Sequence, residues 1–233
     1  MIGSLEFKES THPMSLTALK RQPAEQLATE ALKESILAGD LKPGERLTEA
    51  ALADQFAVSR GTVRTALHQL SRDRLVVLTP YTGWAVATID RQDLWEIYTL
   101  RSGLERLAAR LAAERMNGDG RARLAGVRDA FFAACERADV AFAVDSDFSL
   151  HRTIVELSGN RRLLDQYLMV EQQIRLFINS TYASAPNLSV AIAHHSPIVD
   201  AILAGDGEAA AGHSEHHVLS EGERVLAMVD DAG

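Results

Sequence analysis

Hydrophobic residues in the first third of the chain recur at helical spacing and stop at glycine or proline. The segment "PAEQLATEALKESILAGDLKPGERL" carries apolar side chains close to a 3.6-residue repeat, and the pattern ends at Gly39 and at Pro43-Gly44. This pattern predicts a first helix followed by a turn. The apolar positions are Leu27, Ala31, Leu32, Ile36 and Leu37.

Two shorter helices and a hairpin follow. Thr48 before "EAALADQF" and Ser59 before "RGTVRTALHQLSRD" are typical N-cap residues, so each begins a helix. The next stretch, "RLVVLTPYTGWAVATI", holds two β-rich runs, Val76 to Leu78 and Trp84 to Ala87, around a turn that contains proline and glycine. Three helices and a hairpin in this order predict a compact domain.

From Asp90 onward the chain changes to long helical patterns rich in alanine and leucine. Asp90 is the expected N-cap of the first one, and no strand pattern or fixed repeat follows. The breaks predict six helices, and an all-helical bundle is the simplest architecture for them. These breaks fall at Asn117 to Gly120, near Ala138-Asp139, at Ser158 to Asn160, at Ala185 to Asn187 and at Gly205 to Gly207.

The predicted fold is therefore mainly α, with an N-terminal winged helix-turn-helix followed by a helical bundle. We expect a flexible N-terminal arm over residues 1–16, the DNA-binding domain over 17–88 and the bundle over 89–233. A composition of 46% hydrophobic and 24% charged residues suits a globular protein of this length. The single Cys135, the absence of a targeting pattern and the lack of a long apolar run predict a cytoplasmic protein without a membrane span.

The net charge of -8 is unevenly distributed. Residues 17–88 hold nine Lys and Arg against eight Asp and Glu, whereas residues 89–233 hold fourteen against twenty-two. DNA affinity follows the local patch that faces the phosphates, so the near-neutral first part remains compatible with DNA binding.

The helix after Ser59 has the layout of a recognition helix that enters the major groove with its N-terminal residues at the bases. Arg60 and Arg64 lie one turn apart and can grip guanine in a bidentate way, while Ser59 and Thr62 suit phosphate oxygens. The hairpin tip, Tyr81 to Gly83, would form the wing. The alternative is a plain helical hairpin with solvated arginines. A small core of Leu52, Val58, Val63, Leu67 and Leu70 would hold these helices together.

The stretch "LKPGERLTEAALADQFAVSRGTVRTALHQLSRDRLVVLTPYTGWAVA" resembles the winged helix of the GntR family of bacterial transcription regulators. In the helical half, "DLWEIYTLRSGLERLAARLAAER", "DFSLHRTIVELSGN", "HHSPIVDAILAGD" and "EHHV" resemble the FCD ligand-binding domain of the FadR-type subfamily. The resemblance covers nearly everything after the N-terminal arm. It implies DNA contacts by Arg60, Thr62, Arg64 and Gly83.

The chain departs from this family's pattern at three positions. Ala50 replaces an arginine that some members use on the preceding helix, Arg74 replaces a common glycine, and Thr65 replaces the acid of the usual "VREAL". These departures affect which operator sequence is read rather than whether DNA is bound.

Asp147 and His151 stand four residues apart on one helix face. Their spacing alone suits either a metal site or a hydrogen-bonded pair between helices. The resemblance to metal-binding FCD domains adds partners from two later helices and implies a divalent ion such as zinc, nickel or manganese. The implied ligands are Asp147, His151, His195 and His217.

The remaining histidines of this half are not expected to be ligands. His194 points about 100° away from its neighbour His195 on a helix. His216 likewise neighbours His217. His213 lies one turn before His217 on the same face, so it could be a supporting residue or a competing ligand.

An open metal site in a helical cavity suits a small carboxylate effector, held also by cations and amides. Candidates for that contact are Arg101, Asn160 and Arg175. Arg101 could equally pair with Glu105 at i+4, and Arg175 could be a surface residue.

The favoured function is a ligand-responsive transcription regulator, with repression relieved by the effector as the commoner mode of the family. It would be a homodimer on a pseudo-palindromic double-stranded DNA operator and not an enzyme. One alternative is a direct metal sensor. Another is a metalloenzyme fused to a DNA-binding domain, for which Glu156 or Glu171 would have to serve as general base.

Overall fold

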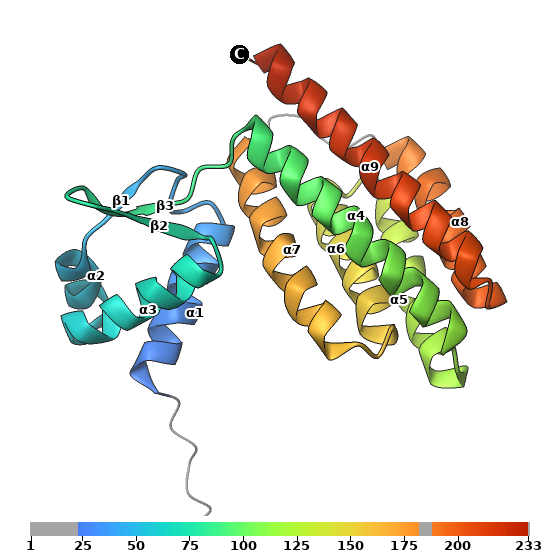
Figure 1. The fold of residues 1–233 in the computed structure, drawn as a ribbon, viewed down its shortest axis with the longest axis horizontal. Coiled ribbons are helices and arrows are strands. Elements are labelled where there is room, and N and C mark those ends of the chain that lie inside the picture. Colours follow the sequence, from blue (N-terminus) through green and yellow to red (C-terminus); the bar gives the residue numbers. More distant parts are fainter. Residues whose placement is uncertain (1–22, 182–187, 233) are drawn as a thin grey trace, which may run out of the picture.

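The computed structural model describes residues 23–181 and 188–232 and contains two parts, a small mixed domain and a helical bundle (Figure 1). The expected N-terminal arm, residues 1–16, lies outside the described residues. The small domain comprises α1 (Ala24–Leu37), β1 (Arg46–Leu47), α2 (Glu49–Phe56), α3 (Arg60–Arg72), β2 (Val76–Thr79) and β3 (Gly83–Val86).

Side-chain caps begin both short helices of this domain, as the sequence predicts. The Thr48 hydroxyl accepts the Ala51 N–H at 3.4 Å, and the Ser59 hydroxyl accepts the Thr62 N–H at 3.1 Å. Between them Ala57 adopts a left-handed conformation with φ 52°, which reverses the chain. These caps and this turn set the position of α3 relative to α2.

The predicted hairpin is confirmed, and it belongs to a three-stranded antiparallel sheet of order β1-β3-β2. Val76 pairs with Val86 across the hairpin. Leu47 pairs with Trp84, which adds the short strand β1 to the sheet. That strand was not predicted because two residues are too few to show an alternating pattern.

The predicted core of this domain is nearly all confirmed. Leu52, Val63, Leu67 and Leu70 are buried, whereas Val58 is only partly buried against the same cluster.

The helical part contains six helices within the described residues, the number that the sequence predicts. Asp90 caps the first of them in a reciprocal capping box with Asp93. The predicted break at Ala185 to Asn187 lies outside the described residues. These helices are α4 (Arg91–Glu114), α5 (Gly118–Glu136), α6 (Val140–Leu157), α7 (Arg161–Thr181), α8 (Leu188–Ala204) and α9 (Gly207–Ala232).

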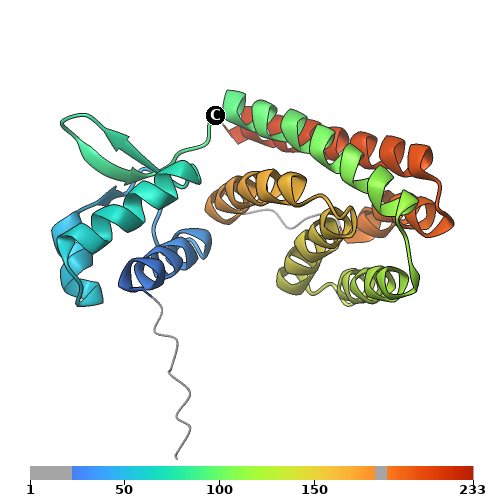
Figure 2. The same ribbon diagram turned by 60° about the horizontal axis from the view of Figure 1, so that its bottom comes forward.

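Helix α7 is the member of the bundle nearest to the small domain, beside α1 (Figures 1 and 2). Its Leu176 is 2% exposed and belongs to the buried cluster of the small domain, together with Leu32 and Ile36 of α1. On the opposite side of α7, Ile174 and Ile178 face the inside of the bundle. One helix thus contacts both parts of the protein.

None of the helices in the described part of the chain combines the length and apolar character needed to cross a membrane.

Candidate functional site: a histidine cluster beside a cavity, and a winged helix

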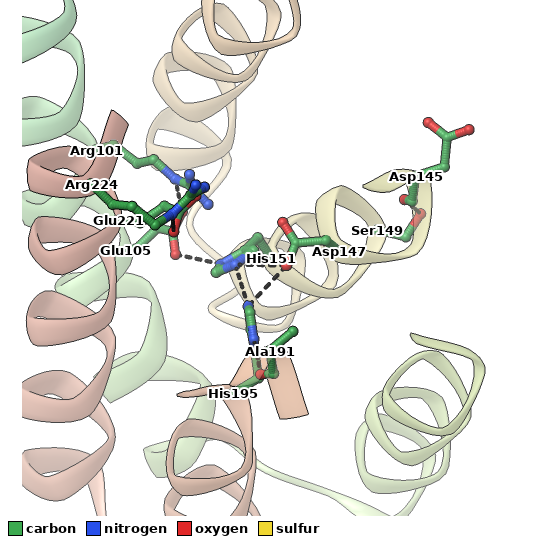
Figure 3. Close-up of polar contacts among 10 residues, drawn as sticks. All are labelled: Arg101, Glu105, Asp145, Asp147, Ser149, His151, Ala191, His195, Glu221 and Arg224. Carbon is green, nitrogen blue, oxygen red and sulfur yellow. Dashed lines mark hydrogen bonds and ion pairs between the residues drawn. The ribbon is translucent and has the colours of Figure 1, made fainter. Parts of the chain in front are cut away.

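Four side chains from three helices converge inside the bundle. Helix α6 supplies Asp147 and His151, α8 supplies His195 and α9 supplies His217. One ring nitrogen from each histidine lies within 4.8 Å of the other two. The Asp147 Oδ1 atom is 2.9 Å from His195 Nε2 and 3.7 Å from His151 Nε2 (Figure 3). These are the four residues that the family resemblance implies as metal ligands.

Hydrogen bonds at the far side of two rings fix their orientation. His151 Nδ1 lies 2.6 Å from the Glu105 carboxylate, and His195 Nδ1 lies 2.7 Å from the Ala191 carbonyl oxygen. Because both oxygens are acceptors, both Nδ1 atoms donate to them. Burial would lower the pKa of His195, but the charge of Asp147 and its contact with Nε2 raise it. The two Nε2 atoms face each other at 3.1 Å (Figure 3).

The third ring, His217, is 8% exposed and stacks on His151 with centroids 5.2 Å apart. Its Nδ1 atom is buried without a hydrogen-bond partner in the described part of the chain. Burial, followed by the charges of His195 and His151, lowers the pKa of His217 well below the ordinary value. This imidazole is therefore neutral near pH 7 and can act as a ligand.

Opposite charges surround the rings, with Arg101 and Glu105 buried and Asp147 partly exposed. Burial alone would raise the pKa of Asp147, but the charges of His151 and His195 lower it well below its usual range. At Glu105 burial would likewise raise the pKa, but the charges of Arg101 and His151 outweigh it and lower the pKa of Glu105 to about 2. Asp147 and Glu105 are thus carboxylates at neutral pH, and they supply the negative charge that a cation needs.

A cavity of about 120 Å³ opens next to the cluster and is lined by residues from α4 to α9. Arg101, predicted as an effector contact, lines this cavity and is 4% exposed. Its Nε atom donates to Glu105 at 2.5 Å, while its Nη2 atom is buried without a hydrogen-bond partner among the residues described. The pairing of Arg101 with Glu105 is therefore observed, and its effector contact stays a prediction for which Nη2 is the nitrogen that remains.

Asn160 and Arg175, the other two predicted effector contacts, do not line the cavity. The Asn160 side chain accepts the Leu163 N–H at 3.2 Å and caps α7. Arg175 donates to Glu171 and Asp145 and lies over the Phe148 ring at 3.9 Å. Both side chains thus have structural partners. Glu171 and the Leu163 N–H are near in sequence, whereas Asp145 and Phe148 come from α6.

The remaining histidines occupy different surroundings. His213 and His216 are exposed and take no part in the cluster. His194, expected to point away, nevertheless lines the cavity, and its ring centroid is 6.4 Å from that of His217. The supporting residue of the cluster is Glu105 rather than His213, and the i+4 spacing of Glu105 from Arg101 indicated its ion pair with that arginine but not its contact with His151.

The two residues considered as a general base lie away from this cavity. Glu171 is buried and pairs with Arg152 and Arg175, and Glu156 pairs with Arg123. Neither carboxylate is positioned to take a proton from a molecule in the cavity.

The N-terminal end of α3 presents the predicted DNA contacts. Arg60 is exposed, and the Ser59 and Thr62 hydroxyls are hydrogen-bonded to each other at 2.8 Å. Arg64 is exposed too, but its Nε and Nη2 atoms donate to the Glu49 carboxylate at 2.8 and 2.7 Å. Glu49 on α2, which the sequence analysis did not single out, thus holds the second arginine of the recognition helix.

The wing is a short turn with left-handed backbone. Gly83 has φ 93°, with open space around the position of a Cβ atom, and Tyr81 at the tip is fully exposed with φ 66°. Arg46 of β1 donates to the Thr82 carbonyl oxygen at 2.5 Å and ties this turn to the sheet. The wing is therefore held to the sheet beside α3 by this hydrogen bond.

A winged helix-turn-helix joined to a helical bundle with a small-molecule cavity defines a class of protein, the ligand-responsive DNA-binding regulator. Comparison with known proteins gives the family. A model of the bacterial regulatory proteins of the gntR family matches residues 24–86, and a model of the FCD domain matches residues 96–220. The chain belongs to the GntR family of transcription regulators and carries the FCD domain of the FadR-type subfamily, so its domains are those of regulators and not of enzymes.

Relatives and solved structures agree with this assignment. The HTH-type transcriptional regulator YdhC of Bacillus subtilis is 28% identical over 206 residues, which are 82% of this chain and 91% of that protein. The HTH-type transcriptional repressor GlaR of Escherichia coli is 25% identical over 81% of this chain and 90% of its own length. A GntR-type regulator from Rhodococcus sp. RHA1 superimposes with a TM-score of 0.74 at 25% identity, covering 87% of this chain and 97% of that one.

Proposed function

We propose that the helical domain binds a divalent metal ion through Asp147, His151, His195 and His217. The observation that carries this proposal is the convergence of three histidine ring nitrogens and the Asp147 carboxylate, with His151 Nε2 and His195 Nε2 3.1 Å apart. Two ring nitrogens and a carboxylate at these distances need a positive charge among them, which a proton on His195 Nε2 or a metal ion can supply. A proton would satisfy this pair alone, whereas a metal ion would also satisfy the unpartnered nitrogen of His217.

The donor set favours a borderline divalent ion. Three imidazoles and one carboxylate suit zinc, nickel or manganese. Held by these four residues, the ion would supply a Lewis-acidic centre with open coordination positions for a ligand oxygen. Glu105 and the Ala191 carbonyl keep two of the imidazoles in the tautomer that a metal requires.

The proposed effector is a small carboxylate. Arg101 lines the cavity with one nitrogen on Glu105 and another, Nη2, that is buried and unpartnered. A buried guanidinium nitrogen without a partner costs free energy, and an anionic oxygen in the cavity would satisfy it. Arg101 thus supports recognition of the acid group of the effector.

The winged helix would read a double-stranded operator through Ser59, Arg60, Thr62, Arg64 and Gly83. Ser59, Arg60 and Arg64 are exposed, and Thr62 and Gly83 are partly exposed, which supports these roles. We infer that the protein is a repressor, which the resemblance to the repressor GlaR supports.

A homodimer on a pseudo-palindromic operator follows from the use of one recognition helix per half-site. The outward face of α4 supports a contact with a second copy. Leu100 and Leu107 on this face are 55% and 38% exposed, and Gly103 lies between them with open space where a side chain would be. A leucine of the partner copy fits over this glycine in a two-fold contact.

The effector would reach the DNA-binding domain through α7. Ile174 and Ile178 line the cavity, and Leu176, on the opposite side of the same helix, is buried in the small domain. A ligand that binds one arrangement of α7 more tightly than another favours that arrangement. Because α7 packs on α1, the shift would move α1 and change the affinity for the operator.

The test compares thermal melting of the full chain after metal loading and after chelation, each with and without acetate. We expect zinc or nickel to raise the melting temperature and acetate to raise it further only with metal present. His217→Ala should abolish both shifts, while His216→Ala, the exposed neighbour on the same helix, should keep both. Equal metal affinity in the two variants would refute the proposed ligand set.

A further inference from the structure

Beyond the histidines and Arg101, the walls of the cavity are mostly apolar. We propose that the effector is a small monocarboxylate with an apolar body, an inference that rests on the proposed function and adds the chemical class of the ligand. Apolar side chains of α5, α6, α7 and α8 form these walls. They are Phe131, Val144, Phe148, Ile174, Ile178 and Leu188.

The arrangement along the helices separates a polar end of the cavity from an apolar one. On α6, Val144 lies one turn before Asp147, and on α8, Leu188 lies two turns before His195. The apolar residues thus continue the cavity from the histidine cluster toward the N-terminal ends of both helices. A ligand with its acid group at Arg101 has its body between these walls.

The size of the cavity limits that body. An engineered apolar cavity of roughly 150 Å³ binds benzene, and the cavity here measures about 120 Å³. A single ring or a short branched chain therefore fits, and a long fatty acid does not.

The remaining polar residues of the lining, which are Tyr98, His194, Glu221 and Arg224, offer little to a hydroxylated or doubly charged body. Glu221 and Arg224, both in the lining, are paired with each other, with Arg224 Nε on Glu221 at 3.0 Å. Tyr98 is 3% exposed and adds one hydroxyl group to the lining. A sugar acid would bury several hydroxyl groups without partners, and a second carboxylate would meet Glu221, so both classes lose affinity.

The experiment titrates metal-loaded full-length protein with benzoate, acetate, gluconate and succinate by calorimetry, and repeats each titration after chelation. We expect the Kd of benzoate to be at least about tenfold lower than that of acetate, because the ring adds apolar burial. Gluconate and succinate should bind no better than acetate. All binding should weaken after chelation.

The outcomes separate this inference from the proposed function. Metal-dependent binding in which gluconate or succinate exceeds benzoate would overturn the apolar body and leave the metal-dependent carboxylate site standing. Binding of benzoate that is equally tight without metal would overturn the proposed function. The absence of binding by all four acids would overturn both.

A pair of variants tests the wall directly. Val144→Thr places a hydroxyl group in the apolar wall with almost no change of shape, and we expect the Kd of benzoate to rise at least about threefold while that of acetate is unchanged. Val127→Thr, at a partly buried valine outside the cavity, is the matched control and should leave both values unchanged. An equal effect of the two substitutions on benzoate would remove Val144 from the binding surface.

Discussion

Leu176 gives the sharpest test of how the two domains communicate. The side chain belongs to the bundle by sequence, but it is 2% exposed and buried among residues of the winged helix. Truncation to alanine at such a site costs about 2–5 kcal/mol. Coupling between two sites is typically about 1–3 kcal/mol. The free energy lost with the Leu176 contact is thus at least as large as the coupling free energy between the cavity and the operator that this contact is proposed to transmit.

The assay measures operator affinity by fluorescence anisotropy in the presence and absence of the effector, with metal loaded. In Leu176→Ala we expect the effector to change operator affinity by less than about twofold, whereas its own Kd for the cavity stays within about twofold of the parent value. The reason is that Leu176 lies on the side of α7 away from Ile174 and Ile178, which line the cavity.

Leu163→Ala is the control, because Leu163 lies on the same helix, is 4% exposed and packs only within the bundle core. It should lower the stability by a similar amount and retain the effector response. A full response in Leu176→Ala, with the bundle folded, would refute α7 as the route between the domains.

Three further substitutions test other contacts. Glu49→Gln removes the charge that holds Arg64, so we expect weaker discrimination among operator bases at that position with nearly unchanged affinity for nonspecific DNA, measured on operator variants. Glu105→Gln weakens the support of His151, so metal affinity measured by competition with a chelator should fall about 10–100-fold. Asp90→Ala removes the cap of α4 and should cost about 1 kcal/mol in denaturant unfolding.

Each of these expectations has a result that would contradict it. Unchanged base preference in Glu49→Gln would mean that Arg64 reads DNA without its carboxylate partner. Unchanged metal affinity in Glu105→Gln would remove that residue from the support of the site. Full stability of Asp90→Ala would show that the capping bond has no net effect, for which Asp93→Ala is a second check.

Local signals in the sequence predict much of the fold. Thr48, Ser59 and Asp90 are cap residues whose effect is confined to the next turn, and all three helix starts are confirmed. Strand β1 was not predicted, because Arg46 and Leu47 become a strand only through pairing with β3. Its existence depends on a contact between distant segments.

The candidate site shows the same limit. Spacing alone brings Asp147 and His151 to one helix face, and only the family resemblance adds His195 and His217. Asn160 was predicted as an effector contact because it stands beside a helix expected to line the cavity, but its side chain caps α7 instead. The contact of Glu105 with His151 spans 46 residues of sequence and could not be inferred from either segment.

The distribution of polar contacts distinguishes an effector-responsive regulator from a direct metal sensor. The histidine cluster and its support draw on α4, α6, α8 and α9, whereas α7 contributes Ile174 and Ile178 to the cavity and no group to the cluster. The ion would therefore take no ligand from α7, the helix that packs on the winged helix, and would act on it only through its neighbours α4 and α6. The body of the effector would contact α7 directly.

This leads to a quantitative expectation for the metal alone. Zinc or nickel added to chelator-treated protein should change operator affinity by no more than about threefold, while subsequent addition of the effector should change it by at least about fivefold, the lower end of typical coupling. Anisotropy titrations at fixed ionic strength measure both, because operator affinity depends on salt. A large change of operator affinity on adding metal without any carboxylate would instead favour the direct metal sensor. Metal binding at the histidine cluster would then affect the DNA-binding domain without a ligand in contact with Ile174 and Ile178 of α7.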